Sequence, residues 1–166
     1  MATPHLVHSN DLPWTDIVQG SRVAIRRKQL GAAAQGKKLG CSLLELLPGK
    51  KSWPHHYHLA NEEALFILEG SGILRLGEER LPVTAGDYVA LPAGPECAHQ
   101  LFNESTQPLR YLAFSTQIEP DVLVYPDSQK VGVMAGAAPG GNKAARTLEA
   151  YLPLSARVGY WEGEVD

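Results

Sequence analysis

The chain has 166 residues, with 15 Lys and Arg against 18 Asp and Glu, six His and two Cys, and 44% of its residues are hydrophobic. This length predicts one domain with terminal tails, and a formal charge of −3 without a long basic run excludes the footprint of a nucleic-acid-binding protein. Apolar runs are too short for a membrane span and the N-terminus lacks a secretory signal pattern, so we expect a cytoplasmic protein without membrane partners in which both cysteines stay reduced.

Residues 1–20 are expected to form an N-terminal arm, after which glycine and proline interrupt the sequence at short intervals. The runs between them are short and rich in β-branched, aromatic and leucine residues, as is typical of strands. The predicted strands are Arg22–Gln29, Cys41–Leu47, Glu63–Glu69, Ile73–Leu76, Tyr88–Leu91, His99–Asn103 and Leu109–Thr116. Glu69–Gly72 has the composition of a tight hairpin, and Leu76–Arg80 that of a second turn. Residues 21–118 are therefore predicted to form an antiparallel sandwich or barrel.

The sequence changes character after residue 118, and residues 119–166 are expected to form a loop-rich C-terminal extension. Val122–Tyr125 predicts one more strand, Val131–Gly141 a loop of small residues, and Thr147–Tyr151 the start of a short helix. Because edge strands of such folds need cover, we predict a homodimer with exchanged or packed terminal segments. The tails also carry large aromatic residues that are expected to pack on the barrel or on a partner subunit: Trp14, Tyr160 and Trp161.

Four of the six histidines, at His55, His56, His58 and His99, lie in two segments that are flanked by proline and glycine. Residues two apart in a strand point to the same face, so His56 and His58 direct their imidazoles together. Glu63 stands at the start of the following strand, where its carboxylate is available as a third donor. With His99 added, three imidazoles and one carboxylate suit a transition metal such as Fe, Mn, Ni, Cu or Zn.

These two segments resemble the two conserved motifs of the cupin superfamily. The first motif is matched by His56, His58, Glu63 and Gly70, and the second by Gly86, Pro92, Gly94, His99 and Asn103. The interval to Gly70 selects Glu63 over Glu62, and the His-x-His pattern selects His56 over His55. The spacers before His56 and His99 are slightly longer than in the family pattern.

The resemblance implies an all-β fold, the cupin double-stranded β-helix or jelly-roll barrel, here with N- and C-terminal extensions. It also implies one divalent transition metal ion inside the barrel (Fe, Mn, Zn or Ni), with His56, His58, Glu63 and His99 as ligands. Because an imidazole must be neutral to coordinate, metal affinity is expected to fall below roughly pH 6.

Other residues of these segments have structural interpretations beside functional ones. His55 is predicted to lie at the rim of the site or in solvent rather than to bind the metal. Cys97 is expected to be a small packed residue, with a role as a soft ligand as the alternative, and Asn103 to cap a turn through its side chain. Residues that can reach a substrate are Tyr57, Arg75, Tyr88, Gln100, Arg110 and Tyr111.

Two classes of function stay open. Four protein ligands around an octahedral ion leave two positions for water or substrate, as Lewis-acid and oxygen chemistry require. Members of the family that this chain resembles include dioxygenases and isomerases of sugars or sugar phosphates, so the resemblance implies an enzyme for a small polar substrate. A substrate phosphate would contact Lys50, Lys51, Arg75 or Arg110. The alternative is a non-catalytic module that binds or senses a small molecule; the sequence nominates no catalytic acid or base.

Overall fold

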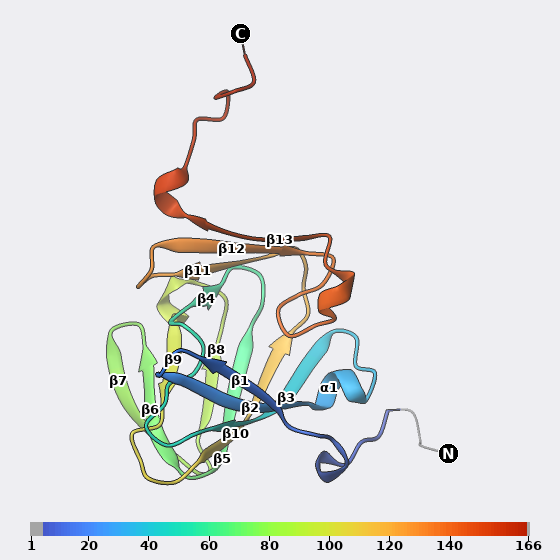
Figure 1. Cartoon of the computed structure of the whole chain (residues 1–166), viewed down its shortest axis with the longest axis vertical. Helices are drawn as coiled ribbons and strands as arrows, with labels where there is room; N and C mark the ends of the chain where they lie inside the picture. The colour runs from blue at the N-terminus through green and yellow to red at the C-terminus, as the bar shows by residue number, and fades with distance from the viewer. Residues whose placement is uncertain (1–4, 166) are drawn as a thin grey trace.

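The computed structural model describes residues 5–165 and confirms the all-β class (Figure 1). Its strands are β1 (Thr15–Gln19), β2 (Val23–Gln29), β3 (Leu39–Leu46), β4 (Tyr57–His58), β5 (Glu63–Glu69), β6 (Ser71–Leu76), β7 (Glu79–Thr84), β8 (Tyr88–Leu91), β9 (His99–Phe102), β10 (Leu109–Thr116), β11 (Asp121–Tyr125), β12 (Lys130–Ala135) and β13 (Leu148–Pro153). Helical structure is limited to α1 (Leu30–Ala33) and four single turns, η1 (Ser9–Asp11), η2 (Pro95–Cys97), η3 (Lys143–Ala145) and η4 (Leu154–Ala156). None of the helices within residues 5–165 has the length and apolarity to cross a membrane.

Two antiparallel sheets enclose the core. The larger has the order β1-β2-β3-β10-β5-β8 and the smaller the order β7-β6-β9. Alternate residues of each strand point inward, such as Leu65 and Ile67 of β5 and Leu109 and Tyr111 of β10, because side chains change face at every residue of a strand. The buried apolar residues of the two sheets meet in one cluster: Ile25, Leu44, Leu46, Leu65, Ile67, Leu74, Val83, Leu91, Leu101, Leu109 and Tyr111.

Gly70 carries the chain from one sheet to the other. The prediction of a hairpin at Glu69–Gly72 is wrong, because β5 pairs with β10 and β8 whereas β6 pairs with β7 and β9. Gly70 has a φ of +84°, and a Cβ at this position would lie 2.5 Å from the carbonyl oxygen of Pro108. Only glycine fits this turn, so the composition that resembles a hairpin instead reflects a close backbone approach. The second predicted turn does close a hairpin, between β6 and β7.

A third sheet, with the order β13-β12-β11-β4, lies across one end of the barrel (Figure 1). The predicted strand Val122–Tyr125 is confirmed as β11. The predicted loop Val131–Gly141 is confirmed over residues 136–141 but is wrong over residues 131–135, which belong to β12. The predicted helix is wrong, since β13 forms an antiparallel pair with β12 there. The small residue Gly132 is explained by its partner across the pair, because a Cβ would lie 2.9 Å from the ring of Tyr151. A glycine covered by an aromatic ring of the neighbouring strand is a known feature of β-sheets and does not indicate a loop.

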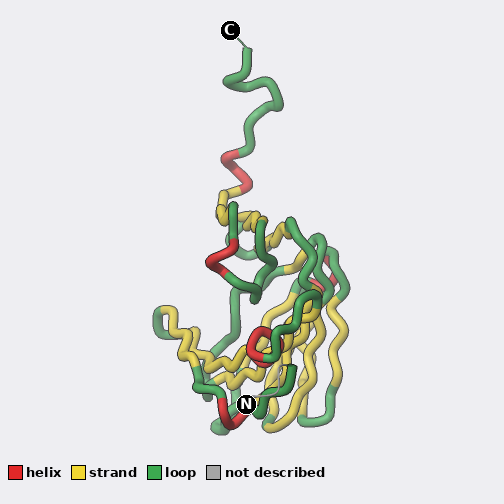
Figure 2. Tube along the Cα trace, turned by 90° about the vertical axis from the view of Figure 1, so that its right-hand side faces the viewer, coloured by secondary structure: helices red, strands yellow, loops and turns green. Residues whose placement is uncertain are grey.

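The predicted boundaries at residues 20 and 118 stay a prediction, and strand pairing crosses both of them. β1 of the N-terminal arm pairs with β2, and β11 of the C-terminal extension pairs with β4. Trp14 packs beneath the cationic groups of Arg26 and Lys28, at 5.1 and 4.6 Å from its ring. The C-terminal segment instead runs away from the sheets (Figures 1 and 2), and Tyr160 and Trp161 are 86% and 64% exposed.

The structure confirms the predicted structural role of Asn103. Its fully buried amide donates to the carbonyl oxygens of Leu46 and Gln107, and its Oδ1 accepts from the amide and hydroxyl of Ser105. We expect Asn103→Ala to lower the free energy of unfolding by about 3 kcal/mol, because several buried polar groups lose their partners. Urea unfolding measures this change, with exposed Asn10→Ala as the control expected to change it by less than about 0.5 kcal/mol. Equal effects of the two substitutions would contradict the role.

Candidate metal centre

Backbone pairing brings the two histidine segments together. His56 precedes β4, His58 ends it, Glu63 begins β5 and His99 begins β9. His56 and His99 form an antiparallel bridge, in which the His56 amide donates to the His99 carbonyl at 3.2 Å and the His99 amide donates to the His56 carbonyl at 2.8 Å. These two residues therefore keep a constant spacing whatever their side chains bind.

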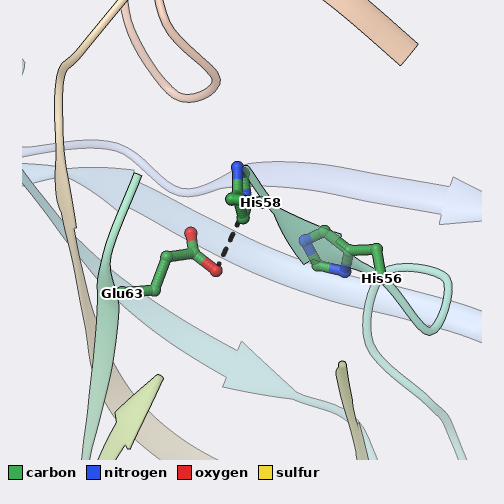
Figure 3. Close-up of side chains that lie close together, drawn as sticks. All are labelled: His56, His58 and Glu63. Carbon is green, nitrogen blue, oxygen red and sulfur yellow. Dashed lines mark ion pairs between the residues drawn. The ribbon is translucent and has the colours of Figure 1, made fainter. Parts of the chain in front are cut away.

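Three of the four predicted residues form one cluster inside the barrel, and His99 lies beside it against Glu63. One ligating atom each from His56, His58 and Glu63 lies within 4.8 Å of the other two, and Figure 3 shows the Glu63 carboxylate directed at His58. Glu63 Oε2 lies 3.5 Å from His58 Nε2 and 3.2 Å from His99 Nε2. The His56 ring centroid is 5.2 Å from that of His58 and 4.7 Å from that of His99.

Each histidine is held by its Nδ1 atom. His56 Nδ1 lies 2.8 Å from the Pro54 carbonyl oxygen, and His99 Nδ1 lies 2.9 Å from the Cys97 carbonyl oxygen. His58 Nδ1 lies 2.5 Å from Asp121 Oδ2. Because these oxygens only accept, Nδ1 carries the proton in all three rings, and the Nε2 lone pair of each neutral imidazole is available to a metal.

The residues present fit a metal ion. His58 Nε2 is buried and has no hydrogen-bond partner among the described residues, which is costly for a polar atom unless something else satisfies it. Three Nε2 donors and one carboxylate form the mixed nitrogen and oxygen set that Fe, Mn, Ni, Cu or Zn accept. The role of these residues as ligands stays a prediction.

The protonation states at the site follow from burial and mutual charge. Burial and the neighbouring His99 lower the pKa of His56 to about 3. Burial also acts to lower the pKa of His58, but the hydrogen bond with Asp121 and the charge of Glu63 outweigh it and raise this pKa to about 9. Burial acts to raise the pKa of Glu63, whereas the imidazoles of His58 and His99 hold it well below its usual range. Without a metal, the site at neutral pH therefore holds an ionised Glu63 beside a protonated His58.

Asp121 and Tyr125 are two neighbours of the site that the sequence did not single out. Asp121 is fully buried against His58, and the Tyr125 ring stacks on that of His56 with centroids 6.0 Å apart. The sequence signal that could have identified them is the two-residue alternation of β11, which places Asp121 on the same face as Leu123 and Tyr125. A carboxylate on the apolar face of a strand needs a buried partner, and His58 provides one.

The other candidates lie elsewhere. His55 is 2% exposed rather than in solvent, and its Nδ1 lies 3.5 Å from Asp127 Oδ1. Cys97 approaches the site through its carbonyl oxygen, which accepts from His99. Tyr111 belongs to the core. Three of the remaining candidates have partners of their own: Arg75 pairs with Asp127 and Glu78, Gln100 donates to the Trp53 carbonyl oxygen, and Arg110 pairs with Glu45 and Glu69. The other two are tyrosines: Tyr57 lies on β4, and Tyr88 on β8 is exposed.

Two curated proteins resemble parts of the chain in sequence. An uncharacterized protein of Methanocaldococcus jannaschii is 37% identical over 60 residues, which cover 36% of this chain and 46% of that protein. Quercetin 2,3-dioxygenase of Bacillus subtilis is 31% identical over 97 residues, which cover 56% of this chain and 28% of the dioxygenase. The chain thus spans less than half the length of either relative.

Solved structures share the fold over most of the chain. A putative sugar phosphate isomerase from Acidithiobacillus ferrooxidans superimposes with a TM-score of 0.77 at 24% identity, covering 93% of this chain and 96% of that one. A sugar phosphate isomerase from Silicibacter pomeroyi gives a TM-score of 0.76 at 22% identity, with 91% and 94% coverage. A predicted oxalate decarboxylase from Thermotoga maritima gives 0.58 at 23% identity, with 67% and 97% coverage.

The cupin motifs lie within the part of the chain that a family model recognises. Residues 42–115 match the model of the cupin domain, and this range contains the four candidate ligands, strands β4 to β9 and all but the last residue of β10. Strand order, motifs and sequence match agree: residues 42–115 of the chain form a cupin domain.

Proposed function

We propose that the chain binds one divalent transition metal ion through His56, His58, Glu63 and His99 and uses it to act on a small polar molecule. The observation that carries this proposal is the common anchoring of three imidazoles by Nδ1, together with the unpartnered Nε2 of buried His58. A bound ion would supply Lewis acidity, and iron would add one-electron chemistry.

The chain's own groups then have distinct tasks. The ionised Glu63 balances the charge of a cation, and the three neutral imidazoles leave the site with low net charge. Tyr125 lies over His56, where burial raises the pKa of its phenol above the usual range. That phenol therefore stays protonated at neutral pH and is available as a hydrogen-bond donor to a ligand beside His56.

Oxygen chemistry of the dioxygenase class is the reaction that we propose first. It is supported by the 31% identity to a quercetin dioxygenase. It is also supported by the state of three of the four cations predicted to hold a phosphate, Lys51 being the exception: Arg75 pairs with Asp127, Arg110 pairs with Glu45, and Lys50 donates to the Ser21 carbonyl oxygen. These groups would have to break their contacts to bind a sugar phosphate.

Sugar-phosphate isomerisation is the second candidate, and one cation favours it. Lys130 Nζ lies 4.9 Å from the centre of the Tyr125 ring, which itself stacks on His56. A phosphate near this lysine would leave the sugar end directed at the histidines. The solved structures of similar length and fold bear isomerase names, at identities that establish the fold alone.

Substrate screens of metal-loaded protein separate these functions. The Fe²⁺ form is tested for O₂ uptake with flavonols, catechols and keto acids, and the Mn²⁺ form for interconversion of aldose and ketose phosphates. We expect O₂ uptake that His99→Ala abolishes. Isomerisation alone would select the second candidate, and metal binding without turnover in either screen would leave a binding or sensing module.

We also propose that the protein is a homodimer in which C-terminal segments contact the partner. Supporting this, Val158, Tyr160 and Trp161 are exposed in a segment that leaves its own barrel (Figure 2). Size-exclusion chromatography with light scattering is expected to give twice the chain mass of 18.0 kDa. Trp161→Ser is expected to shift the mass toward one chain, while Leu6→Ser, at an exposed site of the other tail, leaves it unchanged. A wild-type mass of one chain would rule the dimer out.

The cytoplasmic location stays a prediction.

A further inference from the structure

The His-x-His segment is attached to the C-terminal extension. β4 pairs with β11, with Leu123 opposite His58 and Val124 opposite Tyr57, and the Leu59 amide donates to the Val122 carbonyl oxygen at 2.9 Å. Strand β11 lies outside the range that the cupin family model matches, which ends at residue 115. Two of the three imidazoles of the site, those of His56 and His58, are thus supported by β11.

Asp121 is held rigidly at the start of β11. Its Oδ2 accepts from His58 Nδ1 at 2.5 Å, and its Oδ1 accepts from the Ala60 amide at 3.1 Å. The neighbouring Asn61 donates to the Ile118 carbonyl oxygen and accepts from the Ile118 amide, so the chain just before β11 is fastened to the loop between His58 and Glu63. With both oxygens engaged and the side chain fully buried, the carboxylate has one orientation available.

We infer that Asp121 is a positioning residue of the metal centre, and that the C-terminal extension therefore completes the site. Asp121 keeps the His58 proton on Nδ1, aims Nε2 at the Glu63 carboxylate and makes the ring a stronger donor. Hydrogen bonding of the second ring nitrogen to a carboxylate has these effects on a metal-binding histidine. This inference rests on the proposed metal site and adds a residue that acts through His58.

The same strand supports a second imidazole. Tyr125 lies on the same face of β11, four residues beyond Asp121, and its ring is inclined by 21° to that of His56. Stacking limits rotation of the His56 ring about its last bond. A single inward face, formed by Asp121, Leu123 and Tyr125, thus orients both histidines of the first motif.

The test is the affinity of the full-length protein for Zn²⁺, measured by chelator competition. In Asp121→Asn the amide presents one oxygen and one NH₂ group to two donors, so one of the two contacts must fail. At pH 9.5, where no proton on Nε2 competes with the metal in either protein, we expect the dissociation constant for Zn²⁺ to rise roughly 10- to 100-fold. Asp87→Asn is the matched control, because Asp87 is an exposed carboxylate that accepts from the Thr84 amide in the turn before β8. Its effect is expected to stay within about twofold.

A purely structural role of Asp121 would lower the stability of the metal-free protein and leave the dissociation constant of folded protein unchanged. Binding by Asp121→Asn within twofold of the wild type would therefore overturn the inference. Failure of the wild type to bind Zn²⁺ would instead remove the metal site itself, which is a separate result.

Nitrogen NMR of the Zn²⁺-loaded wild type tests the inference without any substitution. We expect His58 to show a hydrogen-bonded Nδ1 proton and a metal-bound Nε2. A proton on Nε2 with zinc on Nδ1 would overturn the inference even if Asp121→Asn failed to fold.

Discussion

His56→Ala and His99→Ala are each expected to remove the bound metal, from about one ion per chain in the wild type to background. Both rings project Nε2 toward the same point, and His99 Nε2 lies 3.2 Å from Glu63 Oε2. Deleting either ring removes one nitrogen donor from the set of four ligands. The loss should exceed the roughly 10- to 100-fold weakening that follows loss of a ligand's hydrogen-bond partner. Elemental analysis of protein purified without chelator measures it.

The control is His5→Ala, because His5 is an exposed histidine at the far end of the chain. Its Nδ1 lies 3.3 Å from the Ala34 carbonyl oxygen after α1 and contacts none of the four candidate ligands, so the substitution is expected to leave the metal content unchanged. The bridge between His56 and His99 consists of backbone hydrogen bonds, so both alanine variants should keep the fold. Wild-type metal content in both variants would contradict the assignment of these ligands.

The first motif was readable because its chemistry depends on short-range geometry. His56 and His58 share a strand face at a spacing of two, which is a local rule. The choice of Glu63 over Glu62 followed from the motif interval to Gly70, because β4 and β5 lie in different sheets and no strand pairing links them. His99 is remote in sequence, and its place followed from resemblance to the cupin motifs rather than from spacing. The structure accounts for it through the bridge to His56, a contact that no local pattern encodes.

The C-terminal extension was harder to predict because the roles of its residues depend on contacts with neighbouring strands. Gly132 indicates a loop in isolation and a strand when Tyr151 covers it. Asp121 has no motif, and its role depends on a pairing between β11 and β4 that joins residues far apart in the chain. His55 is adjacent to His56 but is buried, with its Nδ1 3.5 Å from Asp127 Oδ1 in the turn after β11. Contacts of this kind follow from tertiary structure alone.

Metal affinity is expected to rise steeply from pH 7 to pH 9, contrary to what ordinary histidines predict. A metal can bind His58 only after its proton leaves Nε2, and Asp121 and Glu63 raise the pKa of this imidazole to about 9 in the metal-free protein. The proton therefore competes with the metal below pH 9, and affinity should increase about tenfold per pH unit and level off above that value. Histidines with the ordinary pKa of about 6.5 would give less than about a twofold change above pH 7.

The same pKa has an opposite consequence for the stability of the metal-free protein. Because the folded state holds the His58 proton more tightly than the unfolded chain, this group stabilises the fold fully below pH 6.5, and its contribution is lost as pH rises through 9. Competition with a chelator, using Mn²⁺ from pH 6.5 to 9.5, gives the affinity profile, and urea unfolding of metal-free protein gives the stability profile. We expect affinity to rise with pH and the free energy of unfolding to fall with pH. Both changes would have one cause, because metal binding releases the His58 proton and unfolding lowers the pKa at which His58 holds it. An affinity that is flat between pH 7 and pH 9 would show that Asp121 and Glu63 do not hold that proton.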